Sequence, residues 1–164
     1  MRVVQRAALV LVICVSLSGA AAAQTVVSGY LVAGVGQDRS PADPNATVHV
    51  AVGAEWRAAN GRLGVGSEIG YLARTRDLSG GFGVLSPNAT LYFKNASRLV
   101  PFATAGYSLL FREAASNAFN VGAGVEYWTP RGIGLRLEVR NHIQSRSPGA
   151  RNHYWVARAG VTSR

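Results

Sequence analysis

The sequence predicts an all-β fold, a single antiparallel up-and-down β-barrel of about eight strands that crosses a membrane. Three observations indicate this fold. Polar and apolar residues alternate in strand-length stretches between residues 25 and 163. The connections between these stretches are alternately long and short. An apolar leader precedes the first stretch, which is typical of an exported chain.

The leader is predicted to be a cleaved signal peptide that covers residues 1–23, and the barrel to occupy residues 24–164. Arg2 and Arg6 give it a basic start, and the apolar run from 7 to 17 is followed by three alanines. This run is too short for a membrane-spanning helix, which needs about 20 residues.

The only cysteine, Cys14, lies inside this leader. Lipid attachment is associated with a small residue directly before the cysteine, and here that residue is Ile13. We therefore expect a mature chain without a lipid anchor, disulfide or reactive thiol.

Two strands show the alternation most clearly, at 46–57 and 62–74, and Asn60-Gly61 between them is a strong hairpin signal. The first places valines, Ala54 and Trp56 on one face, with Glu55 and Arg57 on the other. Further strands are predicted at 99–111, 118–128, 133–142 and 153–163, with weaker ones at 25–36 and near 82–94.

Pro87 conflicts with the fourth of these strands, because proline cannot donate to a sheet and a closed barrel has no free edge to hold it. Either a bulge occurs there, or the strand begins near Ser86 after a loop from about Thr75 to Leu85. The second interpretation is favoured.

The connections predict how the barrel is oriented. Long connections are expected at 37–45, 75–81, 112–117 and 143–152, and short ones at 58–61, 95–98 and 129–132. Outer-membrane barrels have short periplasmic turns and longer external loops. This order places both termini in the periplasm of a Gram-negative-type bacterium.

The polar faces of the strands are predicted to line a narrow lumen. Glycine is frequent on them, which suits a narrow interior, whereas a soluble barrel would carry Lys and Glu facing solvent. Opposite charges occur at matching depth and predict an enclosed ion-pair network. Its members are Glu55, Glu68, Glu126, Glu138, Arg57, Arg136, Arg140 and Arg158.

Aromatic residues stand at both ends of the apolar faces, as expected where strands cross the two lipid interfaces. Trp56, Phe93 and Tyr127 precede short turns. Tyr71, Phe111 and Trp155 lie beside long connections. We interpret these six residues as two aromatic girdles.

The formal charge of +9 falls to +7 without Arg2 and Arg6, and only Lys94 among the basic residues is lysine. An exported chain without a basic helix does not suit nucleic-acid binding. Outer-membrane lipids and anionic lipopolysaccharide are the expected neighbours.

Three segments carry a family resemblance: Pro101 to Gly106, Asn120 to Tyr127 and Gly134 to Arg140. On these the chain resembles the outer membrane protein β-barrel family that includes the OmpA-type membrane domain. The resemblance implies a structural, adhesive or narrow-pore role, handling by the outer-membrane assembly machinery, and a monomer. No peptidoglycan-binding domain is expected after the barrel. Family members usually end on an aromatic residue, whereas this chain ends in Arg164.

Two alternatives remain at this point. Outer-membrane lipid A deacylases are barrels with a catalytic His and Ser near the last external loop, and His142 and Ser145 are the corresponding pair here. A spacing of three places two side chains on opposite strand faces, so the match is poor. The other alternative is a soluble periplasmic lipocalin-like binding barrel.

No cofactor or metal site is predicted. His49, His142 and His153 lie on separate predicted strands without ligand spacing. The glycine-rich stretches precede no helix, so they do not match phosphate-binding loops. The family resemblance, together with the poor match of His142 and Ser145, leads us to expect a non-enzymatic chain.

Overall fold

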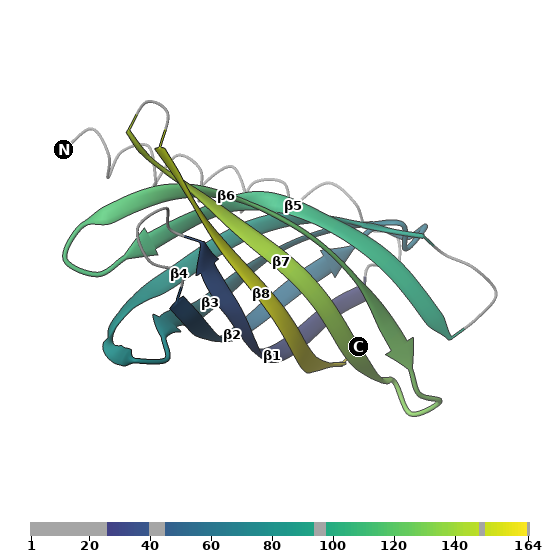
Figure 1. Cartoon of the computed structure of the whole chain (residues 1–164). Coiled ribbons are helices and arrows are strands. Elements are labelled where there is room, and N and C mark those ends of the chain that lie inside the picture. The colour runs from purple at the N-terminus through teal and green to yellow at the C-terminus, as the bar shows by residue number, and fades with distance from the viewer. Residues whose placement is uncertain (1–25, 40–44, 94–97, 148–149, 164) are drawn as a thin grey trace.

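The computed structural model describes residues 26–39, 45–93, 98–147 and 150–163, which form a closed barrel of eight antiparallel strands (Figure 1). The strands are β1 (Val26–Arg39), β2 (Asn45–Arg57), β3 (Leu63–Arg74), β4 (Asp77–Tyr92), β5 (Leu99–Phe111), β6 (Ala115–Trp128), β7 (Ile133–Ser147) and β8 (Ala150–Ser163). Each pairs with the next in sequence, and β1 pairs with β8 to close the barrel. The predicted all-β, up-and-down barrel is confirmed. The signal peptide predicted at 1–23 lies outside the described residues.

No helix in the described part of the chain is long and apolar enough to cross a membrane.

Antiparallel pairing divides the connections between two ends of the barrel. The turn end holds the connections 58–62, 93–98 and 129–132, together with the start of β1 and the end of β8. The hairpin end holds the remaining connections, and paired strands project from it in Figure 1.

The prediction of long loops was wrong at three of the four connections of the hairpin end. β3 and β4 are joined by residues 75–76, β5 and β6 by 112–114, and β7 and β8 by 148–149. The polar segments continue the strand pairing instead, since β7 and β8 stay paired as far as Ser147 and Ala150. A hairpin that extends beyond the apolar band needs no alternation of polarity, so the sequence pattern does not reveal it. At the fourth, residues 40–44 lie outside the described residues.

The expectation that β4 begins near Ser86 was also wrong, because β4 runs unbroken from Asp77 to Tyr92. Pro87 pairs with Ser67 of β3. On the other side, pairing with β5 stops after Leu85 and resumes at Asn88 in unchanged register. The barrel thus accommodates the proline by leaving one short gap in the β4–β5 ladder, which the missing N–H explains.

Two turns at the turn end depend on glycine. Gly61 has φ of 58° and Gly132 has φ of 78°, a region that other residues rarely adopt. Gly132 donates to the carbonyl of Thr129 over 3.2 Å, and Gly61 to that of Ala58 over 2.7 Å. These tight turns fix the register of the strands that they join.

The outer face of the barrel is an apolar band. The side chains named here are between 44% and 64% exposed, and come from all eight strands. They include Val27, Leu31, Val50, Val52, Leu63, Val65, Ile69, Leu91, Leu99, Val121, Leu135, Leu137, Val139 and Val161. In water this surface would be far larger than the apolar patches that soluble monomers carry.

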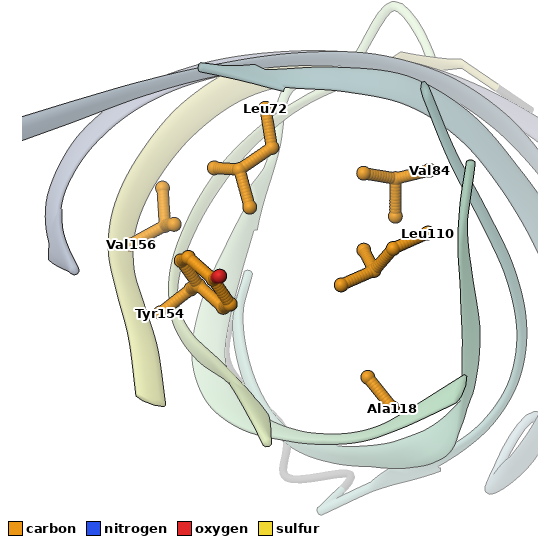
Figure 2. Close-up of a cluster of buried hydrophobic side chains, with 6 residues drawn as sticks. All are labelled: Leu72, Val84, Leu110, Ala118, Tyr154 and Val156. Atoms are coloured by element: carbon orange, nitrogen blue, oxygen red, sulfur yellow. The ribbon is translucent and has the colours of Figure 1, made fainter. Parts of the chain in front are cut away.

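The interior at the hairpin end is apolar, contrary to the expectation of a polar lumen throughout. Leu72, Val84, Leu110, Ala118, Tyr154 and Val156 point inward and form one buried cluster, called the apolar plug below (Figure 2). Phe82 packs against it. Removing a buried leucine side chain such as that of Leu110 costs about 2–5 kcal/mol, so this plug adds to the stability of the barrel.

Candidate functional site

The eight charged residues singled out from the sequence all lie inside the barrel, at most 6% exposed. They come from five strands: β2, β3, β6, β7 and β8. They occupy the middle of the barrel and its turn end, below the apolar plug. The alternation brings them together because every second residue of a strand faces the interior.

The network begins near the turn end and crosses the lumen. The Nε of Arg57 lies 2.9 Å from Oε1 of Glu55, and its Nη2 lies 2.9 Å from Oε2 of Glu126. Glu126 also accepts from Nη1 of Arg136 at 2.8 Å. Tyr92 donates its hydroxyl hydrogen bond to Glu55. Residues of β2, β4, β6 and β7 are thereby connected across the interior.

Glu138 is the centre of the network, because it contacts three arginines. Its Oε2 lies 3.1 Å from Nε of Arg136 and 2.9 Å from Nη2 of Arg158, and its Oε1 lies 2.6 Å from Nε of Arg140. Glu68 of β3 completes the network, with Oε1 at 2.7 Å from Nη1 of Arg158 and 3.5 Å from Nη1 of Arg140. All eight charges are therefore linked in one continuous chain of contacts.

The network is electrically balanced, since it contains four carboxylates and four guanidinium groups. Buried charges are costly unless each is paired and hydrogen-bonded. Loss of one member from such a network leaves an unpaired buried charge, which costs about 3–5 kcal/mol. These eight side chains together add no net charge to the interior of the barrel.

Aromatic rings line the arginines near the turn end, and sequence reasoning missed them. The guanidinium of Arg57 lies 4.0 Å from the ring centroid of Tyr92. That of Arg136 lies 4.0 Å from the ring of Phe102 and 5.1 Å from that of Tyr30. Each of these aromatic residues occupies an inward-facing position of its strand. The alternation of inward and outward positions along the strand was therefore the sequence signal that could have identified them. Cation–π contacts strengthen when they are desolvated, as here.

Glycine on the polar face makes room for these large side chains. A Cβ at Gly53 would lie 2.4 Å from the Tyr30 ring, and one at Gly64 would lie 2.6 Å from the Glu55 carboxyl carbon. Both separations are shorter than van der Waals contact allows. The glycines therefore permit a filled interior, not an empty one.

A layer of His, Ser and Asn side chains separates the network from the apolar plug. Nδ1 of His142 lies 3.0 Å from Oγ of Ser108. The same Ser108 Oγ lies 2.8 Å from Oγ of Ser86 and accepts a hydrogen bond of 3.0 Å from the side-chain amide of Asn120. His142 is fully buried. Its ring is thus hydrogen-bonded to Ser108 inside the barrel, and the side chain of Ser145 lies outside the described residues.

The three histidines are not arranged as a metal centre. The rings of His49 and His142 are adjacent, with centroids 5.8 Å apart, whereas His153 lies near the hairpin end and contacts Asn141. In the part of the chain that the structure describes, no group of three or more His, Cys, Asp or Glu is placed to hold a metal ion.

The six predicted girdle residues all project outward, between 39% and 52% exposed. Trp56, Phe93 and Tyr127 lie at the turn end, and Tyr71, Phe111 and Trp155 lie towards the hairpin end. The Tyr71 hydroxyl donates to the carbonyl of Leu78 and accepts from the N–H of Gly81. The apolar band is therefore bordered by aromatic rings at both ends.

Comparison with known proteins gives matches in structure alone. No protein family matches the sequence, and no curated protein matches it. The neisserial surface protein A (NspA) is similar with a TM-score of 0.74 at 15% identity, over 85% of this chain and 98% of that one.

Two further solved structures are similar. The N-terminal β-barrel domain of OprF from Pseudomonas aeruginosa gives a TM-score of 0.58 at 14% identity, over 82% of this chain and 96% of that one. The outer membrane enzyme PagL gives 0.55 at 16% identity, over 80% and 97%. The chain thus has the fold of the eight-stranded outer-membrane β-barrels.

Proposed function

We propose that this protein is a sealed, non-enzymatic barrel of the bacterial outer membrane, with a structural or adhesive role. The filled interior is the observation that carries this proposal. The apolar plug occupies the hairpin end, the balanced network of eight charges lies towards the turn end, and a polar layer around Ser108 lies between them. An eight-stranded barrel is just wide enough for side chains to fill it, which agrees with a closed lumen instead of a pore.

The outer surface supports the membrane location. A band of exposed valine, leucine and isoleucine between two rows of aromatic rings suits a lipid bilayer with its two interfaces. The same band disfavours a soluble lipocalin-like barrel, whose apolar residues would face inward. Lipids, including lipopolysaccharide on the outer leaflet, are the proposed neighbours, and the protein is proposed to be a monomer.

Conductance tests the sealed lumen. The folded protein, identified by a gel mobility that differs before and after boiling, is inserted into planar bilayers. We expect a membrane current equal to that of protein-free bilayers. Discrete conductance steps from the folded form would contradict a sealed barrel and favour a narrow pore.

Hydrolysis of lipid A tests the non-enzymatic part of the proposal. The fold is shared with PagL, which is an enzyme, but His142 here is bound to Ser108 in the interior. We expect no release of fatty acid from lipopolysaccharide by the folded protein. Release that is abolished by Ser145→Ala would establish the deacylase alternative instead.

We propose that both termini face the periplasm and that the hairpin end faces outward. Arg76→Cys at the hairpin end and Ala59→Cys at the turn end provide a matched pair, because both positions are exposed and the only native cysteine lies in the predicted leader. A membrane-impermeant thiol reagent on intact cells is expected to label the first variant and not the second. The reverse labelling would overturn this orientation.

A further inference from the structure

We propose that the turn end is a binding surface for the phosphate groups of anionic phospholipids, formed by a ring of exposed arginines. This inference rests on the membrane location proposed above and goes beyond it. The acidic and basic residues of the chain are distributed unequally between the two ends of the barrel, and this asymmetry is the starting point.

None of the acidic residues of the sequence falls in the connections of the turn end. Four of the eight form the buried network. Of the other four, Asp38, Asp77 and Glu113 lie at the hairpin end, and Asp43 lies outside the described residues. The segments 58–62, 93–98 and 129–132 contain only basic charged residues. The turn end therefore carries uncompensated positive charge.

One arginine stands in each of these three connections: Arg62, Arg98 and Arg131. All three are exposed. No carboxylate in the described part of the chain lies within salt-bridge distance of their guanidinium groups. Each is therefore available to an external anion. Arginine suits phosphate in particular, because its planar fork can donate two parallel hydrogen bonds.

The backbone at these positions is fixed. The carbonyl of Arg62 accepts from the N–H of Tyr92 over 2.7 Å, and that of Arg98 accepts from the N–H of Trp128 over 3.0 Å. Arg131 lies within the tight turn that Thr129 and Gly132 close. The backbone from which the three arginine side chains extend is thus held in place by hydrogen bonds.

Their position relative to the apolar band identifies a lipid as the ligand. Arg62 and Arg98 directly precede the lipid-facing residues Leu63 and Leu99, and Arg131 lies two positions before Ile133. Leu99 pairs with Tyr127, a girdle residue. The guanidinium groups therefore stand where the apolar surface ends, at the level of lipid headgroups.

The spacing around the rim also favours lipids over an acidic protein partner. The three connections join β2 to β3, β4 to β5, and β6 to β7, so the arginines are distributed around the barrel and do not form one compact patch. A ring of this kind can contact several lipids at once. Each basic residue near a membrane surface attracts anionic lipid modestly, and the attraction weakens with salt.

Tryptophan fluorescence tests this inference, because the two lipid-facing tryptophans report on opposite ends. Trp56 lies at the turn end, Trp155 lies towards the hairpin end, and Trp128 points inward. In the Trp155→Phe variant, Trp56 is the lipid-facing tryptophan and reports on the turn end. In the Trp56→Phe variant, Trp155 is the lipid-facing tryptophan and reports on the hairpin end. Each is folded into phosphatidylcholine vesicles that contain a minor fraction of brominated phosphatidylglycerol or, for comparison, brominated phosphatidylcholine.

In the Trp155→Phe protein, we expect brominated phosphatidylglycerol to quench more strongly than brominated phosphatidylcholine. The expected local enrichment is about two- to fivefold. Adding Arg62→Gln, Arg98→Gln and Arg131→Gln is expected to remove the difference, as is high salt. The matched control Arg76→Gln with Arg112→Gln, at the hairpin end, should leave it unchanged.

Equal quenching by the two lipids in the Trp155→Phe protein would overturn the inference, and so would a difference that survives the three Gln substitutions. The change in gel mobility on boiling establishes folding for each variant, and Arg98→Gln alone serves if the triple variant does not fold. Absence of a folded form of the parent protein in vesicles would instead contradict the membrane location itself. The two failures are therefore distinguishable.

Discussion

The guanidinium of Arg57 binds the carboxylate of Glu126, which lies 69 positions further along the chain, with Nη2 at 3.0 Å from Oε1 and 2.9 Å from Oε2. The contact spans the lumen from β2 to β6, two strands that are not neighbours in the barrel. Charge pairing thus adds links across the interior that the backbone ladder cannot supply. The same network makes stability sensitive to individual charges.

A double-mutant cycle measures that link. Arg57→Met and Glu126→Gln are each expected to lower the free energy of unfolding, because each leaves charges without a partner. The double variant should lose less than the sum, with a coupling of about 1–3 kcal/mol. Urea unfolding in lipid vesicles provides the measurement. The pair Arg62→Met and Glu113→Gln, at opposite ends of the barrel, should be additive; an additive Arg57–Glu126 pair would argue against the contact.

Glu138 is expected to be the most sensitive member of the network. Glu138→Gln leaves Arg136, Arg140 and Arg158 without their shared carboxylate, and we expect a loss of about 3–5 kcal/mol in unfolding free energy. The exposed Glu113 provides the control, because Glu113→Gln should change the unfolding free energy by less than about 0.5 kcal/mol. Similar losses for the two variants would indicate that water enters the network.

The apolar plug and the charged network are expected to act as two barriers in series. Leu110→Ala combined with Tyr154→Ala empties part of the plug but leaves the network in place, so the conductance should stay at the baseline. Adding Arg57→Ala and Glu126→Ala opens both layers and should produce a measurable current. Planar-bilayer recording distinguishes the variants, and a current from the plug variant alone would show that the network does not block ions.

The β3–β4 hairpin, outside the apolar band, is expected to respond to acid. The Ser79 hydroxyl and the Gly80 N–H donate to the Asp77 carboxylate and lower its pKa below the usual 3.8. A lowered pKa stabilises the folded hairpin at a pH above the unfolded value, and this contribution is lost as the pH falls through the folded value.

Amide exchange at Gly80 should therefore accelerate only at acid pH, below about 4. Asp77→Asn should remove this acid-specific step. Persistence of the step in the Asn variant would assign it to another group.

The residues that line the interior of the barrel could be predicted largely because every second residue of a strand faces inward. Glu68 and Arg140 stand on faces whose opposite side is apolar, and that contrast identified them as inward-facing. The same rule applied further along β3 and β5 places Leu72 and Leu110 inside, but their apolar character resembles the lipid face, so the plug was not recognised. Period-two patterns identify a face only while its two sides differ in polarity.

The outer hairpins could not be predicted for a related reason. Beyond the bilayer both faces of a hairpin meet water. The hydropathy of a segment such as 143–147 is therefore the same whether it pairs as a strand or forms a loop. The expected start of β4 near Ser86 was wrong because the hydrogen bond that Pro87 cannot donate was taken as sufficient to end the strand. A single missing donor is a small loss in a strand that pairs on both sides along most of its length.

The pairing of Gly29 with Ser163 joins the first strand to the last. The barrel therefore cannot close until β8 is available to pair with β1. Before that moment β1 and β8 are two unpaired edges, which can pair with other chains. Contacts between such distant parts of a sequence also form slowly. Both edges therefore stay open until the last strand arrives. The neighbouring ends of β1 and β8 offer a site where circular permutation would test which edge closes last.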